Sequence, residues 1–296
     1  MGLTIDRSLE FDFHRFWLYL HSALHLNFQA LYIPHDFVYI GAMQKRLWTR
    51  EELIIAINLY CKLPFGKLHK GTPEIIKIAN LLGRTPSSVA WKLVNFASFD
   101  PSLKARGIKG ASNVSVLDKK IWNEFYNNWE SLSYESEKLF AKLQNKSIEQ
   151  TIDIPEFELR EGKVRERVIK ARVNQSFFRS SILAAYNSTC CITGLKNPVF
   201  LIASHIAPWA SDEKNRLNPR NGLCINSLHD KAFEVGLITI TPFYAIKISS
   251  VLKKDKRQKV IEDYFLKYDN QNIILPSRFL PDPDLLIHHN KERFMR

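Results

Sequence analysis

Apolar residues recur at helical spacing in the first half of the chain. Thr49 and Glu52 have the spacing of a capping box just ahead of such a run, and together they predict a helix over about residues 50–62. A second helix is expected to begin at Pro73 and to end at Gly83, because proline suits the first turn of a helix and glycine the residue after its last turn. This half of the chain is therefore predicted to be helical.

A third helix is expected after the short turn that follows Gly83. Ala79, Gly83 and Val89 have the spacing at which a small residue and a turn glycine let two helices cross steeply, the pattern of a helix-turn-helix. The segment 48–96 resembles Myb-type and related three-helix DNA-binding units. That resemblance implies contact between the third helix and DNA, with a helical scaffold or a protein-binding role as the alternative. The polar side chains expected to meet DNA are Arg84, Ser87, Ser88, Lys92 and Asn95.

Changes in the pattern divide the chain into four segments. Residues 43–139 are expected to form the helical domain, since aromatic residues continue at helical spacing to its end. The polar segment 140–170 is expected to be a linker, and residues 171–296 a C-terminal domain. Residues 1–42 are expected to be an extension outside the folded domains, and a start codon mis-assigned upstream of Met43 would explain it.

The most informative pattern lies in the C-terminal domain. An apolar run of strand length, 199–203, leads to His205, and a polar loop follows. Asn221 and Gly222 provide the turn into a second strand, and a helix then ends before Gly236. The predicted order is strand, loop, strand, helix.

His205, Asn221 and His229 lie in this order within three short motifs, LIASHIAPW, RLNPRNGL and LHDKAFEVG. Their order, spacing and expected secondary structure resemble the HNH endonuclease family, in its bacterial restriction-like branch. The resemblance implies that residues 171–296 are a ββα-metal nuclease domain, so the whole chain is expected to be an α+β protein. It also implies hydrolysis of phosphodiester bonds with a divalent cation, Mg²⁺ or Mn²⁺.

The same resemblance assigns roles to the three residues. His205 would be the general base, since a neutral imidazole can take a proton from water near pH 7, and His229 would hold the metal ion. Asn221 would orient the loop that carries His205 through hydrogen bonds to the backbone, with a metal-facing role left open. Many members of the wider superfamily carry an acidic ligand directly before the base, where this chain has Ser204. The candidates for further metal ligands are Asp230, Ser204 and the Asp212–Glu213 loop.

Charge favours a polyanionic partner. The chain carries 42 Lys and Arg against 30 Asp and Glu, a net charge of +12. Residues 160–296 alone hold 23 basic and 13 acidic residues, so most of the excess lies in the C-terminal part. Neutralised phosphates release counterions, so this charge favours a polyanionic partner, with a merely soluble basic surface as the alternative. The resemblance to the HNH family implies that the partner is double-stranded DNA; whether the chain acts as a homodimer stays open. Arg179, Arg216 and Arg220 are expected to contact the DNA backbone, unless they pair with acidic neighbours.

Composition excludes other classes of protein. No charge-free run reaches membrane-spanning length, and the first residues lack the layout of a signal peptide. Four scattered cysteines without a CxxC pair argue against a disulfide framework and a zinc knuckle, so a reducing cytoplasm is expected.

The expected function is a DNA endonuclease that restricts foreign DNA in a bacterial cytoplasm. The alternatives are a homing or mobile-element nicking endonuclease and a non-catalytic DNA-binding regulator.

Overall fold

The computed structural model describes residues 46–108, 110–111, 114–152, 163–209, 212–255 and 257–296. Trp48–Arg296 form one compact unit. The expected extension, residues 1–42, lies outside the described residues, as does part of the expected linker, 153–162. No helix in the described part of the chain is long and apolar enough to cross a bilayer.

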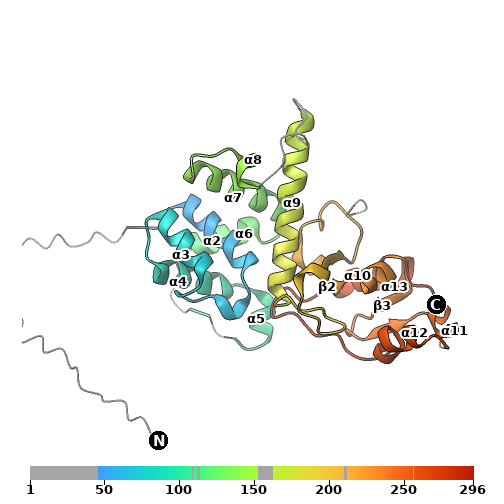
Figure 1. The fold of residues 1–296 in the computed structure, drawn as a ribbon. Coiled ribbons are helices and arrows are strands. Elements are labelled where there is room, and N and C mark those ends of the chain that lie inside the picture. The colour runs from blue at the N-terminus through green and yellow to red at the C-terminus, as the bar shows by residue number, and fades with distance from the viewer. Residues whose placement is uncertain (1–45, 109, 112–113, 153–162, 210–211, 256) are drawn as a thin grey trace, which may run out of the picture. The chain divides into compact units, whose positions relative to one another are not determined.

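The first described region is helical, as its pattern predicts (Figure 1). The predicted capping box is present: the Thr49 hydroxyl accepts from the backbone N–H of Glu52 at 3.2 Å, and the Glu52 carboxylate accepts from that of Thr49 at 2.9 Å. Gly83 adopts the left-handed conformation, with φ of 60°, that ends the second helix. The elements are α2 (Arg50–Lys62), η1 (Phe65–Lys67), α3 (Pro73–Leu82), α4 (Pro86–Ala97), α5 (Pro101–Ala105), α6 (Val116–Phe125), α7 (Trp129–Leu143) and α8 (Ile148–Thr151).

Helix α2 is the centre of this region. All of residues 52–61 are buried, and the helix packs against α4, α6 and α7. The ring of Tyr60 starts an aromatic cluster, with centroids 6.5 Å from Phe96 and 5.9 Å from Trp122. A helix that is apolar on most of its sides must be enclosed by its neighbours, which explains the arrangement of the other helices around it.

A segment close to the C-terminus completes this core. The ring centroid of Phe279 lies 6.4 Å from that of Tyr60. The neighbouring Arg278 is fully buried and donates to the carbonyl oxygens of Cys61, at 3.0 Å, and Leu63. These carbonyls lie at the C-terminal end of α2, where a positive charge is favoured. The helical region and the C-terminal segment therefore share one core.

The second region is a small β/α unit, and the predicted order strand, loop, strand, helix is confirmed. β1 pairs antiparallel with β2, with His205 opposite Gly222, and α10 packs against both strands. The first strand begins two residues later than expected, because Asn197 caps a short 3-10 turn ahead of it. The elements are α9 (Lys163–Ala185), η3 (Pro198–Phe200), β1 (Leu201–His205), η4 (Pro219–Asn221), β2 (Gly222–Asn226), α10 (Ser227–Glu234), β3 (Ile238–Ile240), β4 (Ile246–Ile248), α11 (Ser250–Lys254), α12 (Lys259–Tyr264), η5 (Leu266–Tyr268) and α13 (Pro283–Glu292).

Helix α9 contacts both regions (Figure 1). It starts within the expected linker and runs across the expected start of the C-terminal domain at residue 171. The ring centroid of Phe177 lies 6.5 Å from that of Trp129 on α7, and the next residue, Phe178, packs against His205 at the end of β1. One continuous helix thus connects the helical core to the strand pair.

Candidate functional site

Asn221 closes the loop between β1 and β2. Its side chain is fully buried, and its oxygen accepts from the backbone N–H of Ala207 at 2.8 Å. Its amide nitrogen donates to the carbonyl oxygens of Ala207 and Asn215, both at 3.1 Å. The side-chain amide therefore ties the start of the loop, at Ala207, and its middle, at Asn215, to one point, and both of its N–H groups point to backbone carbonyls rather than to a pocket.

His205, the last residue of β1, is held on three sides. Its ring lies parallel to that of Phe178, with centroids 3.8 Å apart, and edge-on to Trp209 at 5.6 Å. Its Nε2 lies 2.9 Å from the carbonyl oxygen of Arg216. Because a carbonyl only accepts hydrogen bonds, Nε2 carries the proton of the neutral ring and Nδ1 keeps the lone pair.

Burial lowers the pKa of the His205 imidazole below its ordinary value. The hydrogen bond to Arg216 and the negative charge of Asp230 oppose this shift only in part. The ring is therefore neutral near pH 7, which is the protonation state that a general base requires.

Gly222 lets α9 approach the strand pair. A Cβ atom at this position would lie 2.2 Å from Cδ1 of Ile182 and 2.9 Å from Cζ of Phe178. Such distances are far shorter than any normal contact, so a larger residue fits only if the side chains of Ile182 and Phe178 move. The absence of a side chain at Gly222 thus allows Phe178 to reach the imidazole of His205.

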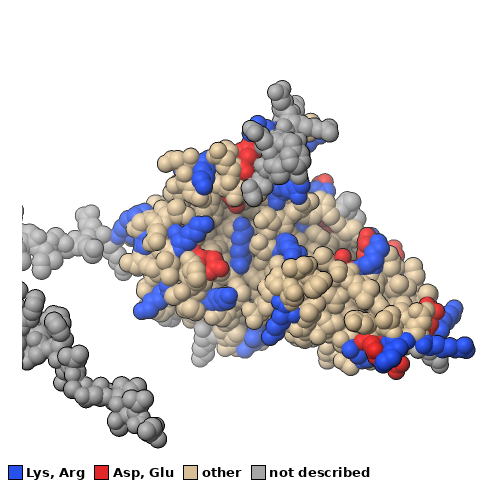
Figure 2. Space-filling view, in the orientation of Figure 1, with Lys and Arg blue, Asp and Glu red and all other residues tan. Residues whose placement is uncertain are grey.

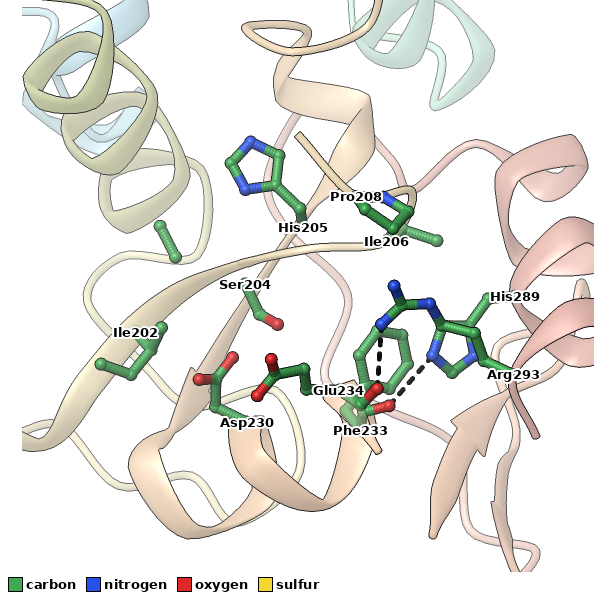
Figure 3. A pocket seen from close by; sticks show the side chains of 11 residues that line it. Ile202, Ser204, His205, Ile206, Pro208, Asp230, Phe233, Glu234, His289 and Arg293 are labelled. Carbon is green, nitrogen blue, oxygen red and sulfur yellow. Dashed lines mark hydrogen bonds between the residues drawn. The ribbon is translucent and has the colours of Figure 1, made fainter. Parts of the chain in front are cut away.

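A pocket of about 300 Å³ lies on the face of β1 opposite to the His205 imidazole (Figure 3). Ser204 lines it from the strand, and Asp230 and Glu234 line it from α10. The two acidic residues are one helical turn apart and so share a face of the helix. Figure 3 shows both carboxylates pointing toward the Ser204 hydroxyl, whereas the imidazole of His205 points to the opposite side of the strand.

His229 has a different environment from the one expected of a metal ligand. Its side chain is 1% exposed, and its Nε2 lies 2.6 Å from the carbonyl oxygen of Tyr264. Its Nδ1 lies 2.7 Å from the side-chain nitrogen of Asn226. Both ring nitrogens are thus occupied inside the fold, and burial lowers the pKa of the imidazole. The neighbouring Asp230, about 100° further round the helix, faces the pocket instead.

The pocket suits a hard divalent cation by the chemistry of its donors. Among the described residues there is no group of three or more His, Cys, Asp or Glu side chains arranged to hold a metal ion. Asp230 and Ser204 instead offer one carboxylate and one hydroxyl, and Glu234 adds a second carboxylate, one oxygen of which accepts from Nζ of Lys231 at 2.9 Å. Mg²⁺ and Mn²⁺ prefer oxygen ligands, and Mg²⁺ sites commonly combine one or two carboxylates with water and substrate phosphate. The donor set therefore fits these cations.

Three residues expected to meet DNA are instead paired within the helical region. Arg84 donates to both carboxylate oxygens of Glu52, at 2.9 and 2.7 Å, and both side chains are almost completely buried. Lys92 and Asn95 both donate to the buried carboxylate of Asp118, at 2.8 Å. The exposed face of α4 carries other side chains, those of Ser87 and Trp91, the latter 64% exposed.

The three arginines of the C-terminal part also have partners. Arg179 donates to the carbonyl oxygens of Leu201 and Pro198, at 2.8 and 3.2 Å. The other two pair with acidic neighbours, Arg216 with Glu213 at 2.9 Å and Arg220 with Asp282 at 3.1 Å. Lys and Arg side chains are nevertheless spread over the face shown in Figure 2, on both the helical region and the β/α region.

Some residues of the site were not expected from the sequence. Glu234 could have been found, because it lies four residues after Asp230 on a predicted helix. No spacing in the sequence pointed to Phe178, which packs against His205, or to Arg293, which lines the pocket. Both are far from the three motifs along the chain, and only the folded structure brings them to β1 and α10.

A histidine at the end of a strand pair, followed by a helix that carries carboxylates, defines this part of the chain as a small β/α unit. Residues 190–241 match the family model described as HNH endonuclease. The chain thus contains an HNH endonuclease domain, preceded by a helical region, and the expected resemblance to this family is confirmed to that extent. The match includes β1, β2, α10 and β3 but neither α9 nor α13. No curated protein matches the chain.

Proposed function

We propose that the protein is a metal-dependent endonuclease that hydrolyses phosphodiester bonds in double-stranded DNA. One observation carries this proposal: Ser204 faces the carboxylates of Asp230 and Glu234, while the next residue, His205, presents a neutral imidazole. The base and the cation-binding pocket thus lie at the same end of β1 but on opposite faces of the strand, so the scissile phosphodiester would lie across this end of β1 to meet both. The HNH match supports DNA as the substrate.

His205 acts as the general base in this proposal. Its Nε2–H stays bound to the carbonyl of Arg216, so Nδ1 is the atom that takes the proton from the attacking water. The water oxygen then attacks phosphorus, and the bond to the leaving oxygen breaks. A positioned base of this kind typically accelerates such a step by about 10²–10⁴-fold.

Asp230 and Glu234 would hold the cation, with Ser204 as a third oxygen donor. When bound, Mg²⁺ or Mn²⁺ supplies stabilisation of the negative charge that develops on the phosphate and on the leaving oxygen. We assign His229 a supporting role, since it joins α10 to the carbonyl of Tyr264. Asn221 has a similar role in the loop, through its bonds to Ala207 and Asn215.

The helical domain, 43–139, would deliver the nuclease to its target DNA. The buried pairs of Lys92 and Asn95 with Asp118 leave the exposed Ser87 and Trp91 as the side chains on α4 able to contact DNA. A DNA-recognition domain joined to a nuclease fits restriction of foreign DNA in a bacterial cytoplasm. The four buried, unpaired cysteines suit that reducing compartment.

Incubation of supercoiled plasmid with the protein tests this proposal. Nicked or linear DNA should form with Mg²⁺ or Mn²⁺ and should not form with EDTA. A protein that binds the plasmid tightly but leaves it intact with either cation would instead be a DNA-binding regulator, and the proposed hydrolysis would be wrong.

A further inference from the structure

The backbone of Arg293 is fixed next to the end of α10. The N–H of Arg293 donates to the carbonyl of His289 at 3.1 Å, and that of Met295 to the carbonyl of Gly236 at 2.9 Å. Gly236 has φ of 78°, and a Cβ atom there would lie 1.9 Å from the carbonyl oxygen of Arg293. Only glycine permits this approach, so the chain after α13 is held against the turn that follows α10.

The side chain of Arg293 lies in the pocket that holds the two carboxylates. One guanidinium nitrogen donates to the carbonyl oxygen of Glu234 at 2.9 Å. Figure 3 shows the guanidinium on the same side of β1 as Asp230 and Glu234. A guanidinium has several N–H donors, and the described residues provide no hydrogen-bond partner for the others. The group is thus anchored by one donor and keeps others for a ligand.

We propose that Arg293 binds a non-bridging oxygen of the DNA phosphodiester that enters this pocket, an inference that rests on the proposed nuclease function. A guanidinium stays charged at all physiological pH values and matches the geometry of phosphate oxygens. The carboxylates of Asp230 and Glu234 repel a phosphate, and a cation bound between them offsets this repulsion on one side. Arg293 supplies positive charge on the other side, from a segment outside residues 190–241.

A second role for Arg293 makes different predictions. If the guanidinium only balances the charge of Asp230 and Glu234, or only stabilises the C-terminal end of α10, then its removal leaves contacts with DNA unchanged. The two roles are separated by the salt dependence of DNA affinity. Each phosphate contact contributes about 0.9 to the slope of log affinity against log salt.

The experiment measures the slope of log affinity against log salt for a short DNA duplex. All variants carry His205→Ala so that the DNA stays intact, and the slope is measured with Mg²⁺ and again with EDTA. We expect Arg293→Ala to reduce the slope with Mg²⁺ by about 0.9 and Arg293→Lys to keep most of it. Arg257→Ala is the matched control, since Arg257 is exposed and lines no described pocket. Equal slopes for Arg293→Ala and its parent would overturn the inference, provided that thermal melting shows both to be folded.

Cleavage provides an independent readout with the otherwise unchanged protein. Loss of one donor to the reacting phosphate typically costs about 10²–10³-fold in rate, so Arg293→Ala should lose that much under single-turnover conditions. If the unchanged protein cuts DNA and Arg293→Ala loses neither salt slope nor cleavage rate, the role of Arg293 is refuted and the nuclease proposal stands. If Arg293→Ala reduces the salt slope but the unchanged protein never cuts DNA, the nuclease proposal is refuted and the phosphate contact of Arg293 stands.

Discussion

The ring of Phe178 lies parallel to the imidazole of His205, with centroids 3.8 Å and planes 7° apart. Phe178 belongs to α9, and the preceding residue, Phe177, packs against Trp129 in the helical region. The orientation of the proposed base is therefore set by a helix that is itself anchored in another part of the core. The stack also leaves the ring fewer orientations, which should favour catalysis.

The first prediction concerns this stack. Phe178→Leu should lower the single-turnover cleavage rate by about tenfold, because aromatic pairs contribute about 0.5–1.5 kcal/mol beyond their burial and the imidazole becomes free to turn. Phe178→Tyr should keep the rate. Phe177→Leu is the matched control, since it removes a buried ring from the same helix without touching His205. Equal losses in the Phe177 and Phe178 variants would show that general destabilisation, and not the stack, is responsible.

The second prediction separates Asp230 from His229. Asp230→Ala should raise the Mg²⁺ concentration for half-maximal cleavage by more than about tenfold, as expected for loss of a metal ligand. His229→Ala should leave that concentration unchanged but lower the free energy of unfolding by about 1–3 kcal/mol, because it leaves buried polar partners unpaired. Metal titrations and urea denaturation of the two variants measure these effects. If His229→Ala shifts the metal titration and Asp230→Ala does not, the ligand is His229, as the resemblance to the HNH family implies.

The third prediction concerns pH. Burial lowers the pKa of His289 from 6.5 to about 4, while its ring donates to the carbonyl of Phe233. Between these two pH values the unfolded chain binds a proton that the folded chain excludes. The free energy of unfolding should therefore fall as the pH drops from 6.5 towards 4, by up to about 1.4 kcal/mol per pH unit, and this contribution should be constant above 6.5.

Urea denaturation at pH 7 and at pH 5 measures this dependence. His289→Gln should show a smaller loss of stability at pH 5 than the unchanged protein does. His288→Gln changes the exposed neighbour on the same helix, whose charge is the smallest of the causes that lower the pKa of His289, and should show nearly the full loss. A difference between the two pH values that is the same in both variants would assign the effect to other groups.

Local signals in the sequence predicted much of the fold. The capping box at Thr49 and Glu52 and the glycine at residue 83 act within one helical turn, and the helices begin and end where these residues indicate. The order of β1, β2 and α10 followed in the same way from short apolar runs and turn residues. Such elements depend on neighbours in the chain, and a sequence displays those neighbours directly.

Contacts between distant residues were not predictable in this way. Lys92 and Asn95 have the polarity of DNA contacts, but folding brings them to Asp118, on another helix. Whether His229 or Asp230 faces the pocket depends on the rotation of α10, which its packing against the strands decides. The position of Arg293 depends on how α13 returns to the end of α10. A single sequence carries no direct signal for any of these contacts.

The rate of cleavage by His205→Ala is the most direct test of His205 as the general base. Single-turnover rates with saturating Mg²⁺ are compared with those of His288→Ala, which removes an exposed histidine from α13, and DNA affinity is measured in parallel. We expect His205→Ala to lose about 10²–10⁴-fold in rate with nearly unchanged affinity, whereas His288→Ala should cut normally. Cleavage at the unchanged rate by His205→Ala would contradict the assignment of His205 as the group that takes the proton from water.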